Sequence, residues 1–402
     1  MGDNMDKIKI GVFGAWRGNA YIDILKKEER TELVAVCDKK FENGEAPEEL
    51  ENVALFSDFD TFLAKGKKLG MNAVFLANYF HQHTPYAIKA MEAGMNVVSE
   101  CTSASTLKEC VELVEAVERT GMKYMIAENY PFMLMNMKMN EIVKSGALGT
   151  LLYAEGEYNH SGDIADLKRL TPEKYHWRAW MPRTYYVTHA MGPLMYMTGS
   201  MPKYVSARAA HSELLYEIRD FRHNYDGVGM MFCEMSNGVI ARFTGCTAMA
   251  SDYSRYRIAG DVASVEGGGY VGENNVRMFY FEHTKPENAE QESIIHVEPE
   301  DLGERTVKAK NAGHGGGDYI VVQNMIDYFL DGKDTFFDVY CGAAMSATAI
   351  LGWRSCLEHG KNFKIPDFRI PEERDAVRND DLTPFPDENG DGITLPCALP
   401  VE

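Results

Sequence analysis

The chain has 402 residues, of which 45 % are apolar and 25 % charged, a balance typical of globular proteins of two or three domains and not of disordered, collagenous or coiled-coil chains. Its 60 acidic and 41 basic residues leave a net charge of −19, which argues against nucleic acid or an anionic membrane surface as a partner. We find no secretion signal, no apolar stretch near the ~20 residues of a membrane span, and no C-x-x-C pair among the eight cysteines. These features predict a cytoplasmic protein with reduced thiols.

Residues 1–130 alternate short apolar runs with amphipathic helical patterns. The runs lack the polar alternation of a half-exposed strand, which indicates a parallel sheet covered by helices on both faces. Ser105 is expected to cap the helix that follows it. This part is therefore predicted to be a doubly wound α/β domain of the Rossmann type. The expected strands are 8–14, 33–38, 73–78, 97–101 and 124–129, and the expected helices are 85–93 and 106–119.

The pattern changes from Pro131 onward. A methionine-rich helical segment is followed by alternating polar and apolar segments, which are typical of an antiparallel sheet with one packed face. We predict an α+β domain over residues 131–366, with a large, mostly antiparallel open sheet. The expected strands lie within 151–160, 228–245, 254–267 and 275–283, and the expected helices are 133–148, a short one near His189, 319–330 and 343–358.

A C-terminal extension is predicted over residues 367–402. It contains Asp387-x-Asn389-x-Asp391-Gly392, which resembles the start of a calcium-binding loop. Such a loop needs a glutamate at its twelfth position, where this chain has Ala398. An acidic turn is the favoured interpretation.

A glycine-rich segment, Gly11-Val-Phe-Gly14-Ala-Trp-Arg-Gly18, follows the first predicted strand. Glycines at this point let the backbone approach a pyrophosphate at a helix N-terminus, although the spacing differs from the usual G-x-G-x-x-G. Asp38 ends the second strand, where an acidic residue binds ribose hydroxyls and repels a 2′-phosphate. The segment therefore predicts NAD rather than NADP as cofactor. The alternative is a plain βα turn followed by a strand-end aspartate.

Two polar segments follow later strands: residues 78–85 (NYFHQHTP) and 99–102 (SECT). Both lie at the carboxyl ends of predicted parallel strands, where open α/β sheets bind their ligands. His81 and His83 have the spacing of a metal pair, but no carboxylate or cysteine lies at ligand spacing from them. We therefore predict no metal site.

Taken together, these segments resemble the Gfo/Idh/MocA oxidoreductase family, and the resemblance runs from Lys7 to about Arg369. In many members of that family the motif after the strand reads E-K-P, and its lysine assists proton transfer at the sugar carbon that loses hydride. Here the motif is Glu100-Cys101-Thr102, without the lysine. The ordinary dehydrogenase mechanism is therefore in question.

One branch of the family departs at the same place, the NAD-dependent glycoside hydrolases of the α-N-acetylgalactosaminidase type. Residues 186–193 (YVTHAMGP) resemble the Y-x-T-H-x-x-G-P of that branch, and residues 252–255 (DYSR) and 313–318 (GHGGGD) resemble its P-Y-S-R and H-G-G-M-D. The resemblance implies that Tyr186 and His189 are catalytic and that Tyr158, Arg178, Thr188 and Tyr253 bind the sugar. It also implies that Gly11, Gly14, Trp16, Arg17, Asp38, Phe80, His83, Glu100 and Asn129 bind NAD.

The residues themselves leave alternatives for several of these roles. Tyr186 and His189 lie three residues apart at the start of a predicted helix, so both side chains can enter one pocket, and both suit acid–base chemistry. From its apolar neighbours alone, His189 would be a buried histidine satisfied by backbone. Tyr158 could be a sheet-packing aromatic, and Arg178 a surface cation beside Trp177. Asp318 is expected to cap the helix beginning at Tyr319, and the role of His314 stays open.

Three functions remain compatible with the sequence. The favoured one is a glycosidase that oxidises sugar C3, removes the C2 proton and eliminates the leaving group without net redox change. The others are a net sugar or polyol dehydrogenase and a non-catalytic dinucleotide-binding protein. Lys174, His176, Arg178 and Arg183 could receive an anionic sugar, although a solvated basic loop is the simpler interpretation. By analogy with the family we expect a dimer or tetramer.

Overall fold

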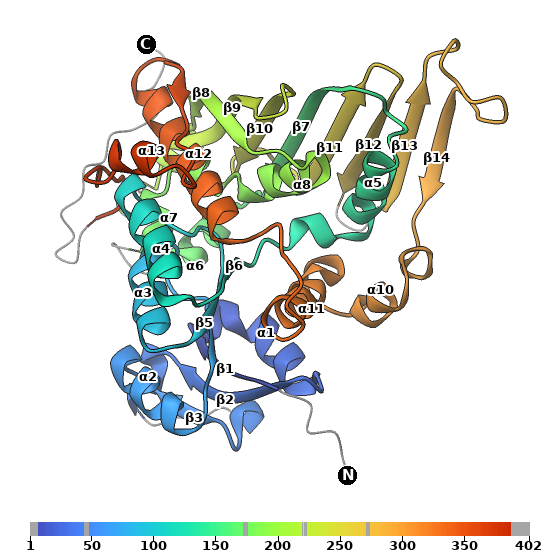
Figure 1. The fold of residues 1–402 in the computed structure, drawn as a ribbon. Coiled ribbons are helices and arrows are strands. Elements are labelled where there is room, and N and C mark those ends of the chain that lie inside the picture. Colours follow the sequence, from blue (N-terminus) through green and yellow to red (C-terminus); the bar gives the residue numbers. More distant parts are fainter. Residues whose placement is uncertain are drawn as a thin grey trace.

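The computed structural model describes residues 7–43, 48–171, 176–218, 220, 223–270 and 274–386. Two sheets organise the molecule (Figure 1): a parallel sheet in the N-terminal part and a large open sheet in the C-terminal part. The possible calcium loop at 387–398 and Lys174 lie outside the described residues. The predicted fold class, a Rossmann domain followed by an α+β domain, is confirmed.

The N-terminal sheet is parallel throughout and has the strand order β3-β2-β1-β4-β5-β6. The order reverses between β1 and β4, and open α/β sheets bind ligands beyond the carboxyl ends of the strands at such a point. The five expected strands are present, and β3 was not expected. The strands are β1 (Ile8–Phe13), β2 (Thr31–Cys37), β3 (Ala54–Phe56), β4 (Ala73–Leu76), β5 (Asn96–Ser99) and β6 (Tyr124–Ile126).

Helices with identifiable caps cover both faces of this sheet. Asp58 caps α2 by accepting a hydrogen bond from Thr61 N, and Thr106 caps α4 by accepting one from Glu109 N. The expectation that Ser105 caps α4 is wrong, because Ser105 instead donates to the Glu109 carboxylate and so completes the cap from the other side. The helices are α1 (Ala15–Lys27), α2 (Phe59–Lys68), α3 (His83–Glu92) and α4 (Leu107–Thr120).

The C-terminal sheet has nine strands in the order β14-β13-β12-β11-β7-β10-β9-β8-β15. Every neighbouring pair is antiparallel except β7 and β10, which run parallel. The alternating segments at 228–245 and 254–267 form strands of the expected antiparallel sheet, as the hairpins β9–β10 and β11–β12. The strands are β7 (Leu151–Asn159), β8 (Pro202–His211), β9 (Asp226–Met235), β10 (Ile240–Cys246), β11 (Tyr253–Gly260), β12 (Ala263–Tyr270), β13 (Asn275–Tyr280), β14 (Glu292–His296) and β15 (Phe363–Lys364).

One face of this sheet is covered by helices, and the other is open (Figure 1). Helix α8 approaches β7 so closely that a Cβ added at Gly156 would lie 2.2 Å from the Ala190 carbonyl oxygen. This contact fixes the helix that carries His189 against the strand that carries Tyr158. The helices of this part are α5 (Leu134–Lys144), α6 (Ile164–Leu170), α7 (Trp177–Trp180), α8 (Thr188–Thr198), α9 (Glu213–Tyr216), α10 (Glu304–Ala309), α11 (Gly317–Phe329) and α12 (Val339–Leu357).

Single 3-10 turns connect several of these elements. Four of them carry residues of the candidate site: Phe80 begins η3, Tyr130 begins η4, Tyr186 ends η5 and His314 begins η7. The turns are η1 (Lys39–Asn43), η2 (Glu48–Leu50), η3 (Phe80–Gln82), η4 (Tyr130–Phe132), η5 (Arg183–Tyr186), η6 (Pro299–Leu302) and η7 (His314–Gly316).

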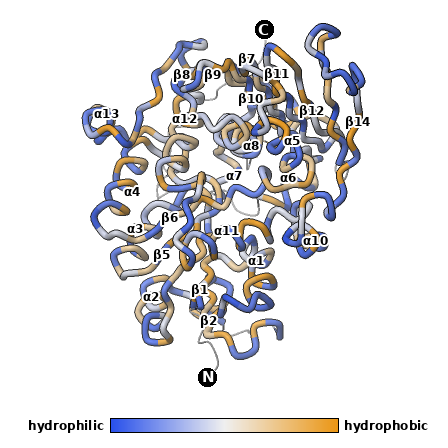
Figure 2. The backbone as a smooth tube through the Cα atoms, turned by 45° about the vertical axis from the view of Figure 1, so that its right-hand side comes forward, coloured by the Kyte–Doolittle hydropathy of each residue, from blue (hydrophilic) through white to orange (hydrophobic). Residues whose placement is uncertain are grey.

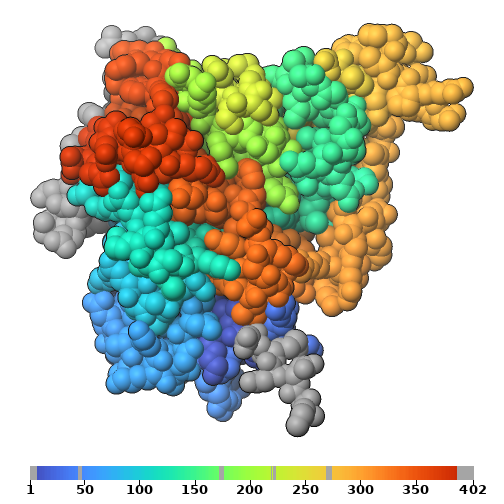
Figure 3. Space-filling model, viewed as in Figure 1, coloured from blue at the N-terminus to red at the C-terminus, as the bar shows by residue number. Residues whose placement is uncertain are grey.

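The described part of the C-terminal extension packs on the Rossmann domain (Figure 3). It contains helix α13 (Pro371–Asp375). Arg374 and Arg378 in this segment bind Glu118 and Glu115 of α4 at 2.6 and 2.8 Å. Phe385 is buried between Phe80, His81 and Tyr185. This part of the extension therefore contributes to the wall behind the ligand-binding edge of the first sheet.

A single core of buried apolar side chains runs through both parts of the molecule. Figure 2 shows mostly apolar residues along α12, which contacts α4 and β8, and mostly polar ones along the exposed α13. Within the described ranges, no helix is both long and apolar enough to span a membrane. The seven cysteines that the structure describes are free and buried.

Candidate active site

The glycine-rich segment forms the turn between β1 and α1. Gly14 has a φ of +96°, and a Cβ there would lie 2.3 Å from the Ala77 carbonyl oxygen, so only glycine fits. Gly11 has a different role, because a Cβ on it would meet the Met71 sulfur and the Phe62 ring. Gly14 thus shapes the backbone cradle, whereas Gly11 serves packing inside the sheet.

Asp38 lies beside this turn. Its Oδ2 accepts a hydrogen bond of 2.6 Å from Ala15 N at the start of α1, and its Oδ1 accepts one from Lys40 N. The carboxylate therefore sits at the helix N-terminus, next to the place that a Rossmann fold offers to a pyrophosphate and ribose. Trp16, with 69 % of its surface exposed, lies on the same rim.

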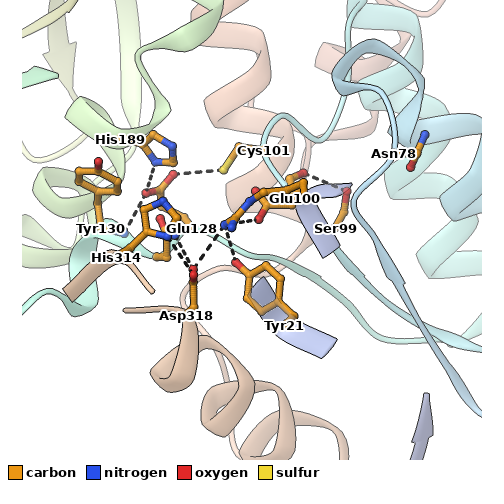
Figure 4. A network of polar contacts seen from close by, with 12 residues as sticks. Tyr21, Asn78, Ser99, Glu100, Cys101, Glu128, Tyr130, His189, His314 and Asp318 are labelled. Carbon is orange, nitrogen blue, oxygen red and sulfur yellow. Dashed lines mark hydrogen bonds and ion pairs between the residues drawn. The ribbon is translucent and has the colours of Figure 1, made fainter. Parts of the chain in front are cut away.

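Arg17 joins the turn to the second polar segment. Its Nη2 lies 2.7 Å from Glu100 Oε1 and 3.4 Å from Asp318 Oδ1, and it donates to Tyr21 Oη at 3.2 Å. Burial opposes the charge of Arg17, but the two carboxylates outweigh it and raise its pKa. Figure 4 shows Tyr21, Glu100 and Asp318 turned toward one point. Arg17 and Glu100 thus form an ion pair that fixes both side chains in the lining of the site.

Asp318 receives donors from several elements. Its carboxylate accepts from Asn129 Nδ2 at 2.7 Å and lies 2.9 Å from His314 Nδ1. Burial disfavours its charge, but His314, Arg17 and Asn129 together lower its pKa. The expectation that Asp318 caps a helix starting at Tyr319 is wrong, because α11 begins at Gly317 and no side chain caps it. Asp318 instead anchors Asn129 and Arg17.

The segment 78–83 forms one wall. The Phe80 ring stacks on Trp177 with centroids 4.8 Å apart, and His83 places its two ring nitrogens 2.7 Å from Thr102 O and 3.3 Å from Asn78 O. Burial lowers the pKa of His83, which favours the neutral ring. His83 therefore also ties together the segments that follow β4 and β5.

The opposite wall carries a buried cluster of acid–base groups. His189 Nδ1 lies 2.8 Å from Glu128 Oε1, and Cys101 Sγ donates to Glu128 Oε2 at 3.2 Å (Figure 4). Tyr130 N also donates to Glu128 Oε1, at 3.2 Å. Burial and Glu128 raise the pKa of the Cys101 thiol, so it acts as a neutral donor. The hydrogen bond of His189 Nδ1 is thus made to a carboxylate rather than to a backbone group. Within the described residues Nε2 has no partner, so it can bind a ligand.

Aromatic rings surround His189 on its other sides. Tyr130 stacks on it with centroids 4.4 Å apart, and Tyr158 and Tyr186 meet it edge-on at 4.9 and 5.8 Å. The Arg178 guanidinium lies over the Trp177 and Tyr186 rings, at 4.4 and 5.6 Å. Burial raises the pKa of Tyr158, so its hydroxyl stays protonated. Two tyrosines and an arginine thus lie within reach of the same ligand as His189.

These groups line one cavity of about 330 Å³ between the two parts of the molecule. A second cavity of about 430 Å³ adjoins it and shares Tyr158, His160 and His314. Buried polar atoms in and beside the first cavity have no partner in the described ranges, namely both amide atoms of Asn78 and Oδ1 of Asn129. Such atoms and the Gly14 cradle fit a dinucleotide. The predicted site residues that line the first cavity are Gly14, Trp16, Arg17, Asp38, Phe80, His83, Glu100, Tyr158, Arg178, Tyr186 and His189.

Four predicted residues lie elsewhere. Gly11 is inside the sheet, and Asn129 lies behind the cavity, bound to Asp318. Thr188 is fully buried with its hydroxyl toward the Cys101 thiol. Tyr253 lies at the rim of the second cavity and donates to Glu157 Oε2 at 3.2 Å. Its partner across the ladder is Asn159, so it points to the open face of the sheet, away from Tyr158.

The sequence did not predict the parts played by three residues of the site: Glu128, whose carboxylate binds His189; Tyr130, whose ring stacks on His189; and Asp318, which binds Asn129 and Arg17. Glu128 and Tyr130 flank the Asn129 that was predicted, at the end of the last parallel strand. Position at the carboxyl end of a strand, which drew attention to segments 78–85 and 99–102, was the available signal for both.

Three family models cover the chain in succession. Residues 8–128 match the oxidoreductase family with NAD-binding Rossmann fold, and residues 136–266 match the GFO/IDH/MocA C-terminal domain. The chain belongs to the Gfo/Idh/MocA oxidoreductase family. Residues 253–372 match the C-terminal domain of glycosyl hydrolase 109, so the resemblance to the glycosidase branch is confirmed as well. The chain is an enzyme of this family, and its cofactor is NAD.

Individual relatives agree with the match to glycosyl hydrolase 109. Glycosyl hydrolase family 109 protein 1 of Shewanella sp. (strain MR-4) is 26 % identical, over 90 % of this chain and 85 % of the relative. An alpha-N-acetylgalactosaminidase of Shewanella oneidensis is 24 % identical over the same shares.

Solved structures share the fold at low identity. They include levoglucosan dehydrogenase in complex with NADH and L-sorbose (TM-score 0.75, 16 % identity, covering 90 % of this chain and 100 % of that one). The WlbA dehydrogenase from Bordetella pertussis has a TM-score of 0.66 at 19 % identity, over 90 % of this chain and 99 % of that one.

Proposed function

We propose that this protein is an NAD-dependent glycoside hydrolase that cleaves its substrate through transient oxidation, elimination, water addition and reduction, with no net redox change. The observation that carries the proposal is the Glu128–His189 pair in the cavity wall, beside a neutral Cys101 thiol at the position that is lysine in the E-K-P motif. Among the described residues, this site contains a base that can remove a carbon-bound proton, and the cation beside Glu100 is the Arg17 guanidinium rather than an ammonium group that could serve a net dehydrogenation.

Gly14 and the start of α1 would hold NAD+, with Asp38 available to its ribose and with Arg17 and Glu100 lining the inner part of the cavity. When bound, it supplies reversible acceptance of hydride, in this proposal from C3 of the sugar. A carbonyl at C3 acidifies the proton on C2. The remaining steps are proton transfers, and these fall to the side chains of this chain.

His189 is proposed to take the C2 proton at Nε2. Glu128 accepts the hydrogen of Nδ1 at 2.8 Å, which selects the tautomer with a free lone pair on Nε2 and stabilises the imidazolium that forms. The stacked Tyr130 ring limits rotation of the imidazole. The neutral Cys101 thiol and Tyr130 N fill the remaining acceptor sites of Glu128 and fix its orientation.

Tyr186 is proposed to give its proton to the oxygen that leaves C1. Its ring lies 5.8 Å from that of His189 and beneath the Arg178 guanidinium, so the two proton-transfer groups can act on neighbouring carbons of one sugar. Arg178 and Tyr158 are proposed to bind the sugar hydroxyls, and burial keeps the Tyr158 hydroxyl a donor. Thr188 and Tyr253 have no direct part in this scheme.

The named relatives support the hydrolase, and the named neighbours in structure favour a second candidate. The curated relatives are glycosyl hydrolase family 109 proteins, whereas levoglucosan dehydrogenase and WlbA are dehydrogenases. A net sugar or polyol dehydrogenase on the same NAD is therefore the alternative function. The substrate is a small carbohydrate in both cases.

Stoichiometry separates the two functions. Purified protein is incubated with a panel of 4-nitrophenyl glycosides and substoichiometric NAD+. The hydrolase releases many equivalents of nitrophenol per NAD+ and accumulates no NADH, and the reaction stops when NAD+ is stripped. NADH formed in proportion to sugar consumed, without nitrophenol, would instead establish the dehydrogenase.

A dimer or tetramer and a cytoplasmic location stay predictions, which light scattering and fractionation can test.

A further inference from the structure

A buried arginine faces a small cavity behind the sugar end of the site. Arg183 begins η5, and only 5 % of its surface is exposed. The cavity is lined by Arg178, Arg183, Tyr186 and His160, together with apolar residues and small hydroxyls, and none of the described residues that line it is a carboxylate. It shares His160, Leu170, Arg178 and Tyr186 with the cavity that holds His189.

The guanidinium of Arg183 has few partners. Nη2 donates to Met181 O at 3.2 Å, and Nε has no partner. In the described ranges no carboxylate lies within ion-pair distance of it; Asp226 accepts the backbone N–H of Arg183 instead, at 2.6 Å. Burial and the neighbouring Arg178 lower the pKa of Arg183, although Asp226 acts against them. A buried guanidinium that forms no ion pair is costly, so proteins rarely keep one without use.

We infer that Arg183, together with Arg178, binds an anionic group of the substrate, so that the sugar cleaved by this enzyme carries a carboxylate, sulfonate or sulfate. This inference rests on the proposed function for the presence of a sugar in the neighbouring cavity. The anion would supply an ion-pair partner for the guanidinium, and two guanidinium groups suit planar or tetrahedral oxyanions. It also corrects the simpler interpretation of this segment as a solvated basic loop, because Arg183 is not on the surface.

The inference is tested by binding, independently of bond cleavage. Protein loaded with NAD+ is titrated calorimetrically with methyl hexopyranosides and with their 6-carboxylate, 6-sulfonate and 6-sulfate counterparts in matched configurations. At least one charged ligand should bind about tenfold or more tightly than its neutral counterpart, as charged hydrogen bonds imply. The three charged arms identify which oxyanion the cavity prefers. Equal affinities for the charged and neutral sugars would overturn the inference.

Variants decide whether Arg183 is responsible. Arg183→Met should abolish the preference for the charged sugar while leaving the affinity for the neutral one. Arg374→Met, which removes an equally buried arginine bound to Glu118, is the matched control and should keep the preference. If Arg183→Met does not fold, Arg183→Lys keeps the charge without the fork and should lower the preference severalfold. A preference unchanged in these Arg183 variants would contradict the inference.

The two proposals fail in different ways. Tight, Arg183-dependent binding of a charged sugar whose aryl glycoside is oxidised but not cleaved would contradict only the hydrolase. Cleavage of neutral and charged glycosides with equal kcat/KM would contradict only the anion site.

Discussion

Nδ1 of His189 lies 2.8 Å from Oε1 of Glu128, and the Glu128 carboxylate is completely buried. The two residues come from different parts of the fold, since Glu128 follows the last strand of the Rossmann sheet and His189 lies in the first turn of α8. The Gly156 contact that fixes α8 on β7 therefore also fixes the His189 side chain beside the cofactor domain.

Replacing Glu128 by Gln should lower kcat by about 10²- to 10⁴-fold, comparable to the loss of a general base. The amide can donate to Nδ1, which favours the tautomer with a protonated Nε2 that cannot accept the C2 proton. The measurement is kcat against pH for wild type and Glu128→Gln, with NAD+ affinity as the control for folding. An unchanged kcat would remove Glu128 from the account.

Replacing His189 by Ala should reduce kcat at least as far as Glu128→Gln, and the double variant should be no slower than His189→Ala alone. Residues that act as one unit give non-additive losses, because either change disables the same base. Steady-state kinetics on the four proteins of this cycle measure the coupling. Additive losses would show that the two residues act independently.

Replacing Asp38 by Asn should weaken NAD+ binding by about tenfold or more and reduce discrimination against NADP+. The ionised carboxylate is the acceptor for ribose hydroxyls and the group that repels a 2′-phosphate. Calorimetric titration with each dinucleotide measures both effects without turnover. Equal NAD+ affinity in variant and wild type would contradict the assignment of Asp38 to the ribose.

Replacing Gly14 by Ala should destabilise the fold by about 2 kcal/mol more than replacing Gly94 by Ala. Both glycines have positive φ, +96° and +84°, so both variants carry the same kind of backbone strain. Only at Gly14 would the new Cβ meet another atom, the Ala77 carbonyl oxygen at 2.3 Å. Urea unfolding of the two variants isolates that clash, and equal losses would refute it.

The partly buried His81 should make the fold sensitive to acid. Burial and the neighbouring His83 and His176 lower its pKa to about 4. Between pH 6.5 and 4 the unfolded chain binds a proton that the folded chain does not, so this contribution is present above pH 6.5 and is lost as pH falls through about 4. At pH 5 the loss is about 2 kcal/mol. Urea unfolding at pH 7 and 5 should show a smaller decrease for His81→Phe than for wild type.

The first sheet could be predicted well because its strands are buried on both faces and read as uninterrupted apolar runs. The three-residue β3 escaped because all of its residues are only partly buried. In the second sheet, β8 was not expected, since its mixed polar and apolar residues do not alternate cleanly. The strands of the hairpins β9–β10 and β11–β12 were predicted because polar and apolar residues alternate in them and turn residues separate them.

The site residues that local motifs carry, such as Gly14 and His189, could be predicted from the sequence. Tyr253 could not be placed, because its direction depends on the ladder register that pairs Ser254 with Tyr158. The burial of Arg183 could also not be predicted from the sequence, since a charged residue in a loop is usually exposed. Both outcomes depend on tertiary packing rather than on local pattern.

The position of deuterium in the product tests the central claim most directly. The enzyme is allowed to cleave a 4-nitrophenyl glycoside in D₂O with substoichiometric NAD+, and the released sugar is examined by NMR. Removal and return of the C2 proton through His189 predicts deuterium at C2, protium retained at C3 and no accumulated NADH. Nitrophenol release with protium fully retained at C2 would contradict the account.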